Sequence, residues 1–294
     1  MNNTINGEEL KKVLDFYLQK FNYEERLKND PVYFPHQYSS TQDIEAAAFI
    51  ASSFAYGKVS LFFGVIKIIL DSFNPRLCES LTKFNAKKDM AKLKGASYRF
   101  NKTEDIAVFL EAAGRFFREC GSISRFLESN YGETDATIMN TASLFVKKML
   151  AYCEAVSLER FGKPLTAGVR QLLPDPENDS TCKRLCMFLR WLTRGPDAID
   201  FGILKNIPKS KLVIPLDTHI ARLSKMLGLT SRKDQSLKTA IEITQNLAKF
   251  EPGDPLKYDF ALCHIGISGL CQKGEEGKNC INCPLNGICL RETS

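Results

Sequence analysis

The sequence lacks an uninterrupted apolar run long enough to cross a membrane. Its most apolar stretch, residues 44–70, contains Glu45, Lys58 and Lys67, whereas a spanning helix needs about 20 nearly uninterrupted apolar residues. The segment Met1–Asn6 is polar and does not show the basic-then-apolar pattern of a secretory signal peptide. We therefore expect a cytoplasmic protein that has no membrane partner.

Glycine and proline are scarce, with 18 and 12 among 294 residues, which is too few for a low-complexity or collagen-like chain. Hydrophobic residues make up 44% and charged residues 25% of the chain, as in soluble globular proteins. A chain of this length suggests about two domains. The net charge of +6 permits a polyanionic partner without requiring one.

Strand patterns are also missing, because nowhere do β-branched residues alternate with polar residues over the length of a strand. The periodicity is helical nearly throughout, and we predict an all-α fold of about ten helices. Ser40 is expected to cap one helix, and Asn101 with Glu104 indicates a capping box at the start of another. Clear helical patterns cover residues 8–21, 43–55, 101–118, 135–155, 181–193 and 214–227.

Residues 83–102 combine seven basic side chains with Phe84, Tyr98 and Phe100. A mixture of basic and aromatic residues suits nucleic acid. A solvated helix face followed by a loop produces the same pattern, and we favour that interpretation.

Cysteines are concentrated in the C-terminal tail, which reads Cys271-x8-Cys280-x2-Cys283-Pro284-x4-Cys289. Four thiolates suit either a tetrahedral zinc ion or a [4Fe–4S] cluster. Zinc sites usually pair two short Cys-x2–4-Cys knuckles and this tail has one, which favours the cluster and leaves zinc as the alternative. Cys263 lies in a helical stretch, and we expect it to be a core residue.

Two further residues could carry chemistry. Lys183 opens a helix, and the helix dipole together with neighbouring Arg184 would disfavour its protonated form, which would make it a nucleophilic amine. Lys183, Arg190 and Arg194 share one helix stripe and form a basic face. By composition alone, Lys183 is an ordinary exposed lysine. Asp217 precedes a helix and is expected to be its N-cap, although its second oxygen could still act in a cleft.

These elements occur in a distinctive order. A polar turn with a helix-opening lysine, Leu173–Arg184, precedes the segment Ile214–Arg222 and then the four-cysteine tail. In this order they resemble the helix-hairpin-helix DNA glycosylase superfamily of endonuclease III type, and more narrowly a poorly characterised bacterial branch of it. The resemblance covers most of the chain, since it extends to Pro35–Gln37, Asp43–Gly57, Cys182–Trp191 and Lys257–Leu262.

The resemblance implies a two-lobed fold with a cleft between the lobes. A helical barrel would span residues 41–204, and residues 1–40 with 205–294 would form a terminal helical domain that holds the cysteine loop. A helix-hairpin-helix would bind double-stranded DNA, and a damaged nucleotide would be flipped into the cleft. The implied protein is a monomeric, nucleoid-associated base-excision glycosylase, with or without AP lyase activity.

The resemblance also assigns roles to residues. Asp217 matches the catalytic aspartate, and Lys183 matches the lysine that attacks C1′ of the sugar in bifunctional members. Tyr56, Arg184 and Arg222 are expected to contact DNA. The [4Fe–4S] cluster would be held by Cys271, Cys280, Cys283 and Cys289.

One segment departs from the superfamily. The turn at residues 175–179 contains three acids and no glycine, whereas superfamily hairpins use glycine to bring the backbone close to a phosphate. A non-catalytic nucleic-acid-binding protein, with an Fe–S cluster or zinc on the same scaffold, is therefore the alternative function. A zinc-bound interaction protein unrelated to DNA is a third and weaker hypothesis.

Overall fold

A computed structural model describes residues 7–20, 27–178, 180–267, 285–286 and 288–289. Within these residues the protein is helical and contains no β-strand, which confirms the predicted all-α class. No helix in this part of the chain is long and apolar enough to span a membrane. The α-helices are α1 (Gly7–Lys20), α3 (Thr41–Phe54), α4 (Val59–Asp71), α5 (Leu77–Lys83), α6 (Thr103–Cys120), α7 (Ile123–Ser129), α8 (Met139–Phe161), α9 (Ala167–Leu172), α10 (Lys183–Thr193), α11 (Thr218–Met226), α12 (Leu237–Ala248) and α13 (Asp259–Ile267). Five short 3-10 helices connect them: η1 (Pro31–Tyr33), η2 (Pro35–Gln37), η3 (Met90–Leu93), η4 (Pro176–Asn178) and η5 (Lys209–Lys211).

Local sequence signals account for most helix starts. The hydroxyl oxygen of Ser40 accepts a hydrogen bond from the backbone N–H of Asp43 (3.1 Å), which confirms the predicted cap of α3. The predicted capping box of α6 is wrong by one position. The helix starts at Thr103, and Asp105 accepts from the backbone N–H of Lys102 (2.8 Å).

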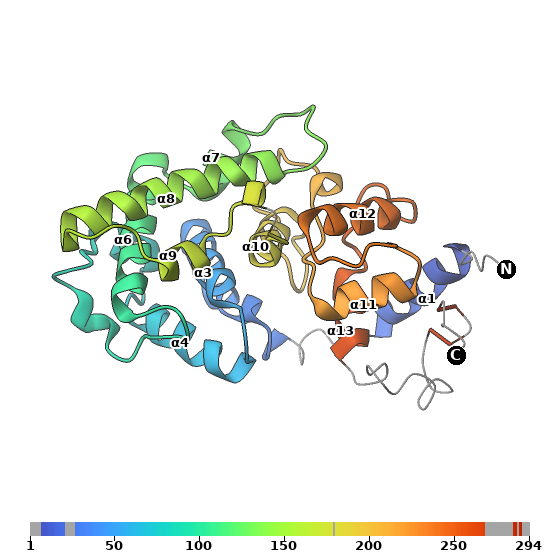
Figure 1. Cartoon of the computed structure of the whole chain (residues 1–294), viewed down its shortest axis with the longest axis horizontal. Coiled ribbons are helices and arrows are strands. Elements are labelled where there is room, and N and C mark those ends of the chain that lie inside the picture. The colour runs from blue at the N-terminus through green and yellow to red at the C-terminus, as the bar shows by residue number, and fades with distance from the viewer. Residues whose placement is uncertain (1–6, 21–26, 179, 268–284, 287, 290–294) are drawn as a thin grey trace.

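The helices form two lobes with α10 between them (Figure 1). One lobe contains α3 to α9, and its core is built from aromatic rings on different helices. The Phe49 ring on α3 lies 5.2 Å from Phe109, 5.3 Å from Phe145 and 5.6 Å from Phe188, measured between ring centroids. Because Phe188 belongs to α10, this aromatic cluster fixes one face of α10 to the first lobe.

The second lobe combines the two ends of the described chain (Figure 1). Helix α1 packs on α13, with Leu10 and Leu14 only 1% and 0% exposed. Asp15 of α1 accepts a hydrogen bond from the Tyr258 hydroxyl (2.9 Å) and pairs with the Lys257 ammonium (3.0 Å). The short helices η1 and η2 pack on α3. Residues 31–37 therefore contact the first lobe, although the resemblance implies a helical barrel that starts only at residue 41.

Candidate active site

Helices α9 and α10 are joined by a turn that contains η4, and we call this helix–turn–helix segment, residues 167–193, the hairpin. Two acids of this turn, Asp175 and Glu177, contact α8 of the first lobe. The carboxylate of Asp175 accepts from the Ser143 hydroxyl (2.7 Å), and Glu177 pairs with the Lys147 ammonium (2.6 Å). Lys147 therefore offsets part of the negative charge of this turn, which would otherwise repel a phosphate.

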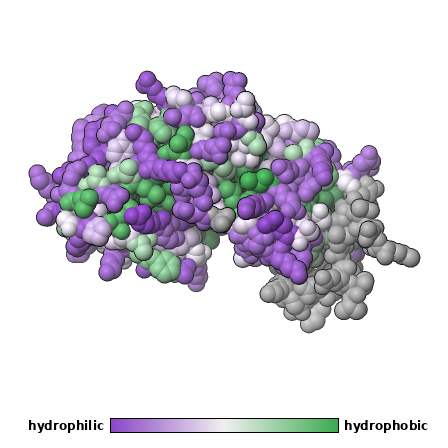
Figure 2. All heavy atoms as spheres, turned by 45° about the horizontal axis from the view of Figure 1, so that its top comes forward, coloured by the Kyte–Doolittle hydropathy of each residue, from purple (hydrophilic) through white to green (hydrophobic). Residues whose placement is uncertain are grey.

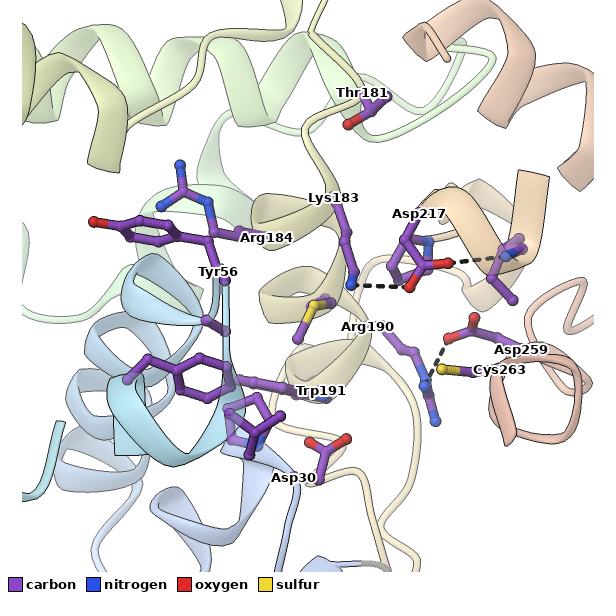
Figure 3. A pocket seen from close by; sticks show the side chains of 18 of the residues that line it. Asp30, Tyr56, Thr181, Lys183, Arg184, Arg190, Trp191, Asp217, Asp259 and Cys263 are labelled. Carbon is purple, nitrogen blue, oxygen red and sulfur yellow. Dashed lines mark hydrogen bonds and ion pairs between the residues drawn. The ribbon is translucent and has the colours of Figure 1, made fainter. Parts of the chain in front are cut away.

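The structure brings Lys183 and Asp217 together, although they are 34 positions apart in the sequence. The Lys183 ammonium donates to Oδ2 of Asp217 at 3.0 Å. Oδ1 of Asp217 accepts from the backbone N–H groups of His219 and Ile220, both at 2.9 Å, which confirms the predicted N-cap of α11. One carboxylate thus caps a helix with one oxygen and holds the lysine with the other (Figure 3).

The protonation of Lys183 differs from the sequence-based prediction. Burial disfavours its charge, but the carboxylate of Asp217 outweighs burial and raises the pKa of Lys183 above its usual value. Burial likewise opposes the charge of Asp217, and the Lys183 ammonium overcomes it and lowers the pKa of Asp217. The expectation of a lysine neutralised by its helix terminus and Arg184 is therefore wrong for the free protein, which holds an ion pair.

The pair lines a pocket of about 1080 Å³. The walls come from the start of η1, the chain between α3 and α4, the hairpin with α10, the start of α11, and α13. In Figure 2 the molecular surface narrows where the two lobes meet, and Figure 3 shows side chains from both lobes around the pocket. The side chains of Lys183 and Asp217 are 38% and 18% exposed, so both are within reach of a ligand.

Tyr56 and Arg184 also line this pocket, but they are bound to each other and to the protein. The Tyr56 hydroxyl donates to Asn101 Oδ1 (2.5 Å), and the Arg184 guanidinium lies 5.0 Å from the centre of the Tyr56 ring. Arg184 donates to the backbone carbonyls of Ser53 and Gln171. The Arg184 guanidinium thus joins the ends of α3 and α9, and its contact with DNA stays a prediction.

Other predicted residues lie elsewhere. Arg222 is half-buried on α11 and does not line the pocket. Three of the four predicted cluster ligands, Cys271, Cys280 and Cys283, lie outside the described residues, and Cys289 is half-buried. The described part of the chain holds no group of three or more potential metal ligands.

The predicted basic face of α10 is an internal ion-pair stripe. Arg190 donates to Asp259 (2.7 Å) and pairs with Asp200 (3.4 Å). Arg194 pairs with Asp254 (2.9 Å) and Asp200 (2.5 Å). The sequence analysis missed these aspartates, which only the folded chain brings near α10. The basic residues do lie on one face of α10, but Arg190 and Arg194 pair with the second-lobe residues Asp259 and Asp254.

Residues 30–268 match the model of a family described as a protein of unknown function, DUF2400. The chain belongs to the DUF2400 family. No curated protein and no solved structure matches the chain.

The DUF2400 match and the pocket coincide closely. Every residue that lines the pocket except Asn29 lies within the matched region. The match ends before Cys271, the first cysteine of the four-cysteine tail. The Lys183–Asp217 pair is therefore part of the DUF2400 region itself.

Proposed function

We propose that this protein is a DNA glycosylase of helix-hairpin-helix type that removes a damaged or modified base from double-stranded DNA. The observation that supports this most is the Lys183–Asp217 pair at 3.0 Å on the wall of a large pocket. An amine beside a carboxylate is the pairing that base excision with strand cleavage requires.

The chemistry can be assigned to atoms. As the bond between C1′ and the base breaks, the base leaves with the electron pair and the sugar gains positive charge, which the Asp217 carboxylate stabilises. The Lys183 nitrogen then bonds to C1′ after its extra proton moves away. Asp217 Oδ2 already accepts a hydrogen bond from that ammonium and is the nearest proton acceptor. The bond between C1′ and O4′ then breaks, O4′ takes up a proton, and the lone pair of the nitrogen forms the Schiff base. Loss of a proton from C2′ and cleavage of the bond between C3′ and its phosphate oxygen complete β-elimination.

The DNA would be held by the hairpin of α9 and α10 and by the net positive charge of the chain. We expect a monomer acting at the nucleoid of the cytoplasm. The C-terminal thiolates Cys271, Cys280, Cys283 and Cys289 would hold a [4Fe–4S] cluster, which four cysteines suit, with zinc as the alternative. Iron, sulfide and zinc analysis of the purified protein decides between the two.

A non-catalytic nucleic-acid-binding protein is the second candidate. Two observations favour it: the turn at residues 175–179 has no glycine, and Lys183 is engaged in an ion pair with Asp217 that raises the pKa of the lysine. A binder without catalysis would show DNA affinity that falls steeply with salt and no product from any lesion.

Borohydride trapping distinguishes the two functions. We expect the wild type to form a covalent adduct with an abasic duplex and with at least one member of a panel of oxidised, alkylated and deaminated bases. Lys183→Ala should lower the yield of the covalent adduct by at least about 100-fold. Lys163→Ala is the matched control, because this exposed lysine pairs with Glu104 outside the pocket. No adduct and no abasic product on any substrate would favour the binding protein.

A further inference from the structure

Trp191 carries a polar group that can meet a ligand in the pocket. Trp191 of α10 is 2% exposed and lines the pocket, yet its indole N–H donates to no group in the described part of the chain. The indole nitrogen is not one of the fully buried side-chain atoms that lack a partner, so it is open to the pocket that Trp191 lines. A tryptophan whose donor faces a cavity is therefore suited to meet an acceptor on a ligand.

Asp30 supplies the complementary acceptor. It caps η1, where its Oδ1 accepts from the backbone N–H of Val32 at 2.9 Å. Its other oxygen, Oδ2, accepts from no described residue. Asp30 lines the same pocket, and Figure 3 draws it with Trp191 at the end of the pocket away from Thr181.

The surroundings of this donor and acceptor suit a flat ring. Phe62, Phe63 and Met187 line the pocket with them and offer apolar surface to the faces of a base. Burial raises the pKa of Asp30, opposed by the Val32 hydrogen bond and by the nearby cations of Arg190 and Lys183. Asp30 and Lys183 line the same pocket.

We propose that Trp191 and Asp30 form a base-reading subsite for a lactam edge, the N–H beside a C=O that uracil-, thymine- and hypoxanthine-type bases present. Trp191 donates to the carbonyl oxygen, and Asp30 Oδ2 accepts from the ring N–H. This deepens the proposed function and rests on it for the biological substrate.

The number of hydrogens favours a lactam over an amino-substituted edge. A ring N–H has one hydrogen, which the single unpartnered carboxyl oxygen satisfies. An exocyclic amine would bring a second N–H into the buried end of the pocket, and an unpaired buried donor is costly. Adenine- and cytosine-type bases should therefore bind more weakly.

Trp191 is the only tryptophan of the chain, so intrinsic fluorescence reports on this subsite directly. The test titrates the full-length protein with deoxyuridine and with N3-methyldeoxyuridine, which lacks the ring N–H. We expect a saturable change in emission with deoxyuridine and affinity at least about tenfold lower for the methylated nucleoside. Equal affinity for the two, no response to either, or tighter binding of deoxycytidine or deoxyadenosine would overturn the proposal.

Asp30→Asn is the sharpest variant, because asparagine can keep the Val32 cap with its oxygen while its amide replaces Oδ2 by a donor. We expect it to lose the preference for deoxyuridine over the N3-methyl form. Trp191→Phe, followed by calorimetry, should lower deoxyuridine affinity to a similar extent, and an unchanged affinity contradicts its assigned role.

Trapping on abasic DNA separates this inference from the proposed function, because an abasic site has no base to read. If the wild type traps abasic DNA but neither variant changes nucleoside preference, the subsite is wrong and the glycosylase stands. If the wild type neither traps DNA nor leaves an abasic product on any substrate, while the nucleoside titration behaves as expected, the subsite stands and the glycosylase is wrong.

Discussion

At Lys183, two opposing effects decide whether the side chain can act as a nucleophile. Burial alone would favour the neutral amine, whereas Asp217 at 3.0 Å stabilises the ammonium and prevails. The resting protein therefore holds a protonated lysine, and reaction requires that the proton be removed. Asp217 lowers the reactivity of Lys183 at rest, because it stabilises the ammonium. During the reaction the same carboxylate can accept the proton of the lysine, which explains why the two residues belong to one site.

Asp217→Asn should separate base removal from sugar trapping. Asparagine can keep the cap of α11, while loss of the carboxylate leaves burial unopposed and lowers the pKa of Lys183. We expect base excision to fall by about 100-fold or more. Trapping of a preformed abasic site near neutral pH should be retained or become faster.

The pH dependence provides the control for this variant. Because the wild-type Lys183 pKa is raised above 10.5, its neutral fraction and trapping rate should rise about tenfold per pH unit between pH 7 and 9. In Asp217→Asn the trapping rate should stop rising at a lower pH than in the wild type, because the pKa of Lys183 is lower in the variant. Parallel loss of excision and trapping, with an unchanged pH profile, would contradict the role given to Asp217.

Arg190 tests the ion-pair stripe beneath the pocket. Its side chain is 7% exposed, and those of its partners Asp200 and Asp259 are 0% and 6% exposed. Arg190→Met leaves two buried carboxylates without this cation, and the free energy of unfolding should fall by about 3–5 kcal/mol, as measured by urea denaturation. Arg76→Met, which breaks an exposed pair with Glu79, should cost less than about 1 kcal/mol. A similar fall in the free energy of unfolding for both variants would contradict the greater importance of the buried ion pairs of Arg190.

At the level of elements, the docking of α1 depends on Asp15. Burial opposes its charge, but hydrogen bonds from Lys11, Lys257 and Tyr258 lower the pKa of Asp15 to about 2. A carboxyl group with a lowered folded-state pKa stabilises the fold above its unfolded value of about 3.9, and this stability is lost as pH falls through 2.

Asp15→Asn should therefore destabilise the protein by about 1 kcal/mol at pH 7. The difference from wild type should shrink as pH falls from 4 toward 2. Amide hydrogen exchange in α1 should quicken in the variant while exchange in α6 stays unchanged. Equal stability of the two proteins at pH 7 would show that α1 docks through its leucines alone.

The sequence predicted elements well where the signal was local. Residues 181–193 were expected to be helical and form α10 at Lys183–Thr193, and the cap at Ser40 lies where the pattern placed it. The interpretation of faces was weaker. Phe84 and Tyr98, which suggested stacking on bases, are 4% and 6% exposed and belong to the core. Helical periodicity defines a stripe, but the partner of that stripe is set by tertiary packing.

At the level of the whole molecule, α10 joins the two lobes. Its aromatic face packs in the first lobe through Phe188, and its basic stripe pairs with aspartates of the second lobe. Those aspartates lie 34, 69 and 60 positions in the sequence from their partners Lys183, Arg190 and Arg194. Local patterns drew attention to Lys183 and to Asp217 separately, but only the resemblance placed the two residues in one site.

The most direct test of the account is to identify the residue that becomes attached to DNA. Wild-type protein is trapped with borohydride on an abasic duplex, digested with a protease, and the peptide that carries the sugar is sequenced by mass spectrometry. The account predicts that the modified residue is Lys183. Attachment at another lysine, with Lys183 unmodified, would contradict it.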